Sequence, residues 1–176
     1  QRGRSAEALD WLDRALPHLA QRDAAESNRA AILLALQRYP EALATAESVL
    51  SRRPDHVGAQ QHRRLALWAL ARAGVDGGYF AQIAGEATAP TNARIQALRI
   101  LGFRKAPELA DVVPPALGSA EPRVRFAAVQ AVHQSGERAF LPALIHHASV
   151  EKDRVTSFAT WRAMRPWSAP PPSHQP

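Results

Sequence analysis

Residues 38–56 read RYPEALATAESVLSRRPDH, and small side chains stand where an isolated helix would carry Leu or Ile. Ala42, Ala46 and Val49 are spaced four and three residues apart, so they lie on one face of a predicted helix. Pro54 ends that helix, because its ring clashes with the preceding turn and removes a hydrogen-bond donor. A helix that buries only a narrow stripe of small residues has no core of its own. The stretch therefore predicts one unit of a stacked array.

The same pattern occurs earlier in the chain. Ala8, Leu12 and Ala15 repeat the spacing of four and three, and Ala8 lies 34 residues before Ala42. Residues 26–39, ESNRAAILLALQRY, have the apolar spacing of an intervening helix. Recurrence at a period of this length is typical of repeat proteins built from paired helices.

At these residues the chain resembles the tetratricopeptide repeat (TPR) family, whose 34-residue unit is a pair of helices with small residues at fixed contact positions. A repeat that starts at Asp23 fits the family pattern up to Pro54 except at two places, where Glu26 replaces a large apolar residue and Val49 replaces Ala. In the next helix, a shift of two residues from strict counting puts Ala66 at the small contact position. The resemblance covers residues 1–75 and implies TPR-type helix pairs there.

A different period begins after two stretches that break the helical pattern, 74–78 (GVDGG) and 89–92 (APTN). From there, corresponding positions of two helix pairs recur at a separation of 31 residues. They are Arg94, Ala97 and Leu101 with Arg125, Ala128 and Val132, and Val113 and Leu117 with Leu144 and Ala148.

Residues 121–132, EPRVRFAAVQAV, resemble the short HEAT-like repeats known from phycobiliprotein lyases. This resemblance spans residues 91–165 and implies a fold only, because such repeats occur in proteins of many functions. We therefore predict an all-α protein, a right-handed α-solenoid of TPR-type helix pairs followed by HEAT-like helix pairs. Its predicted parts are TPR-like repeats over 1–75, a junction over 76–90, HEAT-like repeats over 91–165 and a disordered Pro-rich tail over 166–176.

Charge is distributed unevenly along the chain, whose net charge is +6. Residues 1–60 hold eight basic and eight acidic residues, whereas residues 61–176 hold fourteen basic and eight acidic ones. This surplus allows an anionic partner without requiring one. Twenty of the basic residues are Arg, which favours a bacterial source with a GC-rich genome.

Motifs of the common catalytic and metal sites are missing from the sequence. The chain has no Cys, which excludes disulfides, thiolate zinc sites and Cys nucleophiles. It has no phosphate-binding glycine loop, no G-x-S-x-G elbow and no H-E-x-x-H pair. The seven histidines lack ligand spacing and are expected to face solvent or a groove. We predict a protein that is not an enzyme, with no cofactor and no metal site.

The predicted function is a non-catalytic scaffold for protein interactions within a larger protein or complex. Stacked helix pairs form a groove that holds a peptide, a helix or a partner subunit. In the complete TPR the groove positions are Ser27, Ala31, Leu34 and Ala35, which are small or apolar, so we expect an apolar helix as the guest.

Tryptophans offer a further clue to interaction surfaces. Trp11, Trp68 and Trp161 fall within helical patterns and are expected to pack in the interior, whereas Trp167 in the Pro-rich tail is a candidate recognition element.

The alternative function is binding of nucleic acid or another anionic surface. Equivalent positions of stacked repeats line up, so Arg94, Arg125 and Arg154 form a candidate basic ladder, and such ladders contact phosphates in HEAT-like DNA glycosylases. The competing interpretation pairs these arginines with acids of the adjoining turns, such as Glu121 or Asp153. We favour the scaffold over nucleic-acid binding.

No apolar run in the sequence approaches the length of about 20 residues that spans a bilayer. We expect a cytoplasmic location, with membrane attachment through residues that precede Gln1 as the alternative.

Overall fold

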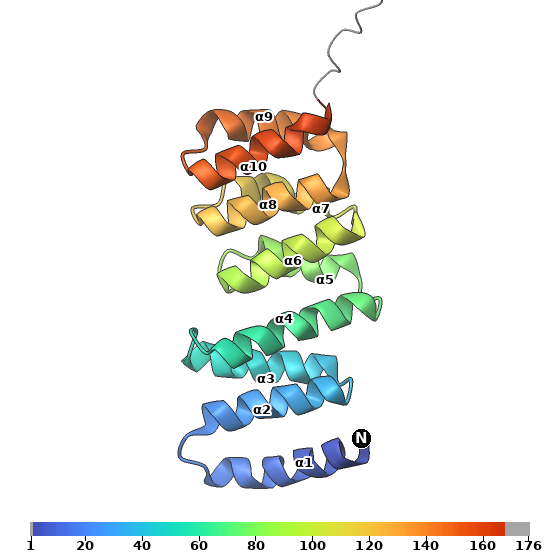
Figure 1. The fold of residues 1–176 in the computed structure, drawn as a ribbon, viewed down its shortest axis with the longest axis vertical. Coiled ribbons are helices and arrows are strands. Elements are labelled where there is room, and N and C mark those ends of the chain that lie inside the picture. Colours follow the sequence, from blue (N-terminus) through green and yellow to red (C-terminus); the bar gives the residue numbers. More distant parts are fainter. Residues whose placement is uncertain (1, 168–176) are drawn as a thin grey trace, which may run out of the picture. The chain divides into compact units, whose positions relative to one another are not determined.

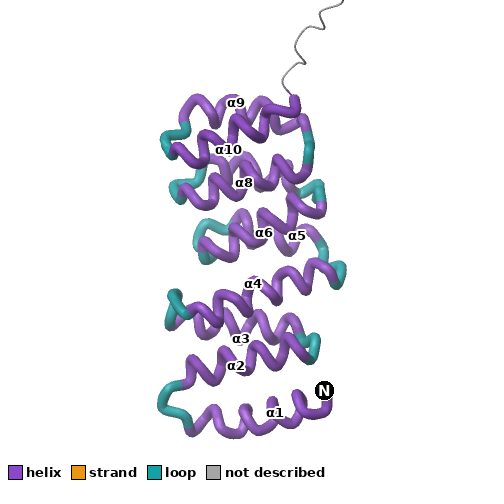
Figure 2. The backbone as a smooth tube through the Cα atoms, in the orientation of Figure 1, coloured by secondary structure: helices purple, strands orange, loops and turns teal. Residues whose placement is uncertain are grey.

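The computed structural model describes residues 2–167 of the chain. Within them the protein is all-helical, with ten α-helices, three short 3-10 helices and no strand, which confirms the predicted fold class (Figures 1 and 2). The α-helices are α1 (Arg2–Ala15), α2 (Arg22–Ala35), α3 (Tyr39–Arg52), α4 (Val57–Arg72), α5 (Gly77–Gly85), α6 (Thr91–Arg104), α7 (Leu109–Leu117), α8 (Pro122–Ser135), α9 (Leu141–Val150) and α10 (Arg154–Met164). The 3-10 helices are η1 (Leu16–His18), η2 (Arg138–Phe140) and η3 (Arg165–Trp167).

The chain divides into two compact units, the first ending at Val75 and the second beginning at Asp76. In the first unit α2 packs on both α1 and α3, and α4 packs against α2 and α3. The small residues of the opening stretch, Ala42, Ala46 and Val49, are fully buried in this stack. They are therefore contact points between helices, where a larger side chain would force the neighbours apart.

Two polar residues of α2, Glu26 and Ser27, lie against neighbouring helices of the first unit. Glu26 pairs with Arg52 of α3 at 2.5 Å, so a charged contact replaces the apolar one that the family pattern has at this position. Ser27 lies against α4, where a Cβ atom added to Gly58 would approach the Ser27 hydroxyl to 2.9 Å. In α4 itself Ala66 is fully buried, as the shifted register predicts.

The second unit stacks its helices in two rows. α6, α8 and α10 pack side by side in one row, while α5 and α7 lie behind them and α9 packs on α10. Two side-chain hydrogen bonds join α6 to α8, from Arg99 to Gln130 at 3.4 Å and from Arg123 to Asn92 at 3.0 Å. Each bond links residues 31 positions apart, so the predicted sequence period is the repeat of the stack.

Gly102 brings α6 and α8 closest together. A Cβ atom at this position would lie 2.6 Å from the Cα atom of Ala131 and 2.8 Å from its carbonyl oxygen. Backbone atoms cannot yield as a flexible side chain does, so only glycine fits at this contact.

Helical structure extends into two segments that were predicted to lie outside the repeats, the junction 76–90 and the start of the Pro-rich tail. The predicted junction, 76–90, contains α5, which packs on α6 and α7. The first residues of the predicted Pro-rich tail form part of η3, which ends at Trp167. The remainder of that tail, 168–176, lies outside the described residues.

Ala46→Leu should destabilise the first unit by roughly 1 to 3 kcal/mol, because it adds volume at a fully buried helix contact. Ala44→Leu, at an exposed position of the same helix, is the matched control and should change the free energy of unfolding by less than about 0.5 kcal/mol. Urea denaturation of both variants provides the measurement. Equal stability of the two variants would contradict the stacked-repeat interpretation of residues 38–56.

Gly102→Ala should destabilise the second unit, although replacing Gly by Ala inside a helix ordinarily stabilises it by about 1 kcal/mol. The new methyl group would meet the backbone of Ala131. Gly85→Ala is the matched control, because a Cβ atom at Gly85 meets nothing within 4 Å. Thermal melts should show a lower melting temperature for Gly102→Ala and an unchanged or higher one for Gly85→Ala. A stabilising Gly102→Ala would mean that α6 and α8 are less closely packed.

Candidate functional site

α10 forms because its first turn is capped and its buried hydroxyls have partners. The carboxylate of Asp153 accepts a hydrogen bond from the backbone N–H of Thr156 at 2.7 Å, which satisfies a free donor at the helix start. The hydroxyl of Thr160 donates to the carbonyl oxygen of Thr156 at 2.8 Å. Thr156, Thr160 and Ala163 are spaced four and three residues apart and make up the buried face of the helix.

Three large apolar residues of α10 are exposed. The exposed fractions of Val155, Phe158 and Trp161 are 66%, 71% and 63%. α10 thus buries Thr156, Thr160 and Ala163 together with Met164 while it exposes Val, Phe and Trp, unlike an ordinary amphipathic helix. Exposed apolar side chains of this size mark a candidate interaction site.

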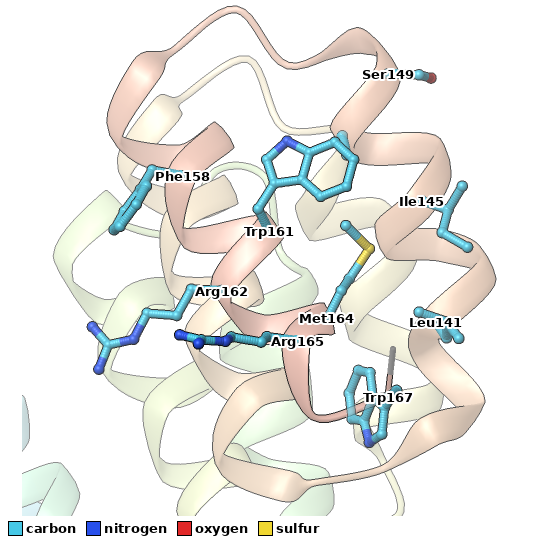
Figure 3. Close-up of a pocket in the computed structure, with 10 residues that line it drawn as sticks. Leu141, Ile145, Ser149, Phe158, Trp161, Arg162, Met164, Arg165 and Trp167 are labelled. Atoms are coloured by element: carbon cyan, nitrogen blue, oxygen red, sulfur yellow. The ribbon is translucent and has the colours of Figure 1, made fainter. Parts of the chain in front are cut away.

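Trp161 also borders a groove between α9 and α10, with a volume of about 1070 Å3. Figure 3 shows Met164 of α10 pointing towards Leu141 and Ile145 of α9, and Trp167 beside Leu141. Met164 is buried, whereas Ile145 is largely exposed. We call this the α9–α10 groove; its lining residues are Leu141, Ile145, Ala148, Ser149, Phe158, Trp161, Arg162, Met164, Arg165 and Trp167.

The charged residues that line the α9–α10 groove are all basic. No Asp or Glu lines it, whereas Arg162 and Arg165 do. The only acids between residues 138 and 167 are Glu151, whose side chain is buried, and Asp153, which caps α10. The exposed basic residues of the same segment are Arg138, Lys152, Arg154, Arg162 and Arg165.

The groove is held in place by an ion pair between α8 and the loop that joins α9 to α10. The guanidinium of Arg125 donates to both carboxylate oxygens of Glu151, at 2.6 and 2.8 Å. It also donates to the carbonyl oxygens of Ser119 and Ala120. The hydrogen bonds from Arg125, helped by the backbone N–H of Asp153, lower the pKa of Glu151 to about 2.

His147 lies beside this pair, contrary to the expectation that the histidines face solvent or a groove. Its side chain is buried, and its Nε2 atom is 3.1 Å from a Glu151 oxygen without the geometry of a hydrogen bond. Burial lowers the pKa of His147, which keeps the imidazole neutral at pH 7. Across residues 2–167 no group of three or more His, Cys, Asp or Glu residues is arranged to hold a metal ion.

The four predicted groove residues of the first unit do not form one exposed surface. Ser27 is buried between α2 and α4, and its hydroxyl lies 3.3 Å from Nδ1 of His62. Ala31 and Leu34 are half-buried, and Ala35 alone is exposed. Ser27 therefore serves the contact between repeats.

The arginines of the candidate basic ladder differ in their surroundings. Nε of Arg94 donates to the carbonyl oxygen of Ala84 at 3.1 Å. Arg125 directs its guanidinium to Glu151 and two carbonyl oxygens, whereas Arg154 is exposed. The acid that pairs with Arg125 is thus Glu151, and neither Glu121 nor Asp153.

The prediction that the helical tryptophans pack in the interior is wrong for two of them. Trp11 is 76% exposed, and Trp161 is the exposed residue described above. The sequence did contain a signal for Trp161, because the 31-residue register aligns it with Gln130 and Arg99. Both of those positions are polar, so a solvent-facing site was indicated there.

Comparisons with known proteins support the repeat assignment of the second unit. The family model of HEAT repeats matches residues 80–165. No match to the TPR family was found, so TPR-type repeats in the first unit stay a prediction. No curated protein and no solved structure matched the chain. None of the helices described between residues 2 and 167 is both long and apolar enough to cross a membrane.

Glu151→Gln should lower the free energy of unfolding by about 3 to 5 kcal/mol at pH 7, because it leaves the guanidinium of Arg125 without its charge partner. Asp111→Asn, at an exposed carboxylate of α7, is the control and should have little effect.

The same pair predicts a pH dependence. A carboxylate whose pKa is lowered on folding contributes stability above its unfolded pKa, and that stability is lost as pH falls. Between about pH 4.5 and pH 2 the unaltered protein should lose stability more steeply than Glu151→Gln. Urea denaturation at intervals across this range is the measurement. Parallel curves would show that the ionisation of Glu151 contributes nothing to the pH dependence of stability.

Proposed function

We propose that this protein is a non-catalytic scaffold that binds a helix of a partner protein in the α9–α10 groove. The observation that carries the proposal is the exposure of three large apolar residues of α10, Val155, Phe158 and Trp161. HEAT repeats commonly serve as protein-interaction scaffolds, which supports the same function.

Physical considerations favour a bound partner over a free surface. Fully burying one large apolar side chain contributes roughly 1.5 to 3 kcal/mol. Ile145, Phe158 and Trp161 are each more than half exposed and lie around one groove, so a single guest would cover all three. Clustered aromatic residues of this kind dominate the energetics of many interfaces.

Binding of nucleic acid through the basic ladder is the alternative that the sequence raised. The engagement of Arg125 with Glu151 disfavours it, because phosphate binding would have to compete with a buried ion pair. We therefore base the proposed function on the groove.

An affinity capture experiment with the whole chain tests this function. A partner protein should be retained by the unaltered chain in the presence of nuclease and lost with Trp161→Ala, because the indole borders the groove. Trp11→Ala removes an exposed tryptophan of the first unit and should retain the partner. Capture that nuclease abolishes would favour the nucleic-acid alternative, and capture unaffected by Trp161→Ala would exclude the groove.

A further inference from the structure

We infer that the guest of the α9–α10 groove is an amphipathic helix of another polypeptide, with an apolar face and acidic flanks. The inference rests on the proposed function and specifies the chemistry of the partner.

By the repeat register, Trp161 and Met164 correspond to two residues through which an earlier helix contacts its neighbour. α6 contacts the following helix, α8, through Arg99 and Gly102. Two repeats of 31 residues later, the equivalent positions are Trp161 and Met164. Trp161 thus occupies the position at which α6 contacts the following helix through Arg99, and no helix among residues 2–167 covers Trp161, which is 63% exposed.

Side-chain size distinguishes this surface from the interior of the stack. Inside the stack Gly102 lets two backbones touch, whereas Met164 and Trp161 hold an incoming helix further away. A guest would thus lie on side chains between α9 and α10, as amphipathic helices do in apolar grooves. The walls are helices of 10 and 11 residues, about 15 Å at 1.5 Å per residue, so they match roughly three turns of a guest helix.

The basic residues at the groove favour a guest helix with acidic residues on its flanks. Arg162 of α10 and Arg165 of η3 line the groove, and in Figure 3 both side chains extend away from α9. Acids on the flank of the guest nearest to them would meet complementary charge, and no lining acid repels them. The guest should therefore carry Glu or Asp beside its apolar face.

Three other occupants fit these features less well. A second copy of the chain carries the same net charge of +6, which opposes association at a basic rim. The sequence of 168–176, SAPPPSHQP, contains neither an acidic nor a large apolar residue. A membrane surface is broad and flat, whereas here Met164 of α10 points towards Leu141 and Ile145 of α9 across a groove.

Three synthetic peptides of 14 residues test the inference against the whole chain. All share Leu at helical spacings of three and four, and their flanking positions carry only Glu, only Gln or only Lys. Fluorescence anisotropy of the labelled peptides at 0.15 M salt gives each dissociation constant. We expect the Glu peptide to bind about tenfold more tightly than the Lys peptide, with the Gln peptide between them.

Variants connect this preference to the groove. Trp161→Ala should weaken all three peptides, and Arg162→Glu should abolish the preference for Glu over Lys. Trp11→Ala and Arg72→Glu, at exposed positions of the first unit, should leave every dissociation constant unchanged. Because all four side chains are exposed, the folds should be retained, and circular dichroism melts check this.

The possible outcomes distinguish failure of the acidic-guest inference from failure of the proposed scaffold function. Equal binding of the three peptides, weakened by Trp161→Ala, would overturn the acidic guest while leaving the scaffold function intact. Absence of Trp161-dependent peptide binding would overturn the inference, and the capture experiment would then decide the function by itself. Trp161-dependent sedimentation with phosphatidylserine vesicles, but not with phosphatidylcholine vesicles, would overturn both in favour of a membrane partner.

Discussion

The second unit depends on one constraint, the close approach of neighbouring helix backbones at small residues. Gly102 against Ala131 is its tightest instance, and it fixes how far α8 slides along α6. The hydrogen bonds from Arg99 to Gln130 and from Arg123 to Asn92 follow from that placement. At the positions equivalent to Gly102, α8 has His133 and α10 has Met164, so among the described repeats this glycine contact joins α6 and α8 alone.

Periodic features of the fold were predictable from sequence because stacking forces small residues to recur. The stripe of Ala42, Ala46 and Val49 and the 31-residue register both arise in this way, and each is buried or bonded as expected. The HEAT-repeat match over 80–165 agrees with the second register. Features that occur once have no such signal. The sequence indicated an acid of an adjoining turn as the partner of Arg125 but not which one, and the partner is Glu151, 26 residues away in a loop.

The candidate site shows the limit of reasoning from residue type. A tryptophan within a helical pattern is ordinarily a core residue, so Trp161 was assigned to the interior although its repeat position is polar. The TPR pattern placed Ser27 at a groove position, whereas in the structure Ser27 is buried and lies against α4 beside Gly58. In both cases the identity of the neighbouring repeat, and not the residue itself, decides exposure.

The 31-residue register also bears on how the second unit acquires its structure. Hydrogen bonds between α6 and α8 join residues one repeat apart, so no strand or helix must find a partner from a distant part of the sequence. Closing such short loops costs little entropy, and contacts of this kind favour rapid folding. Order can start at any adjacent pair of repeats and spread to the next. For the same reason, such a stack can open locally, one pair of repeats at a time.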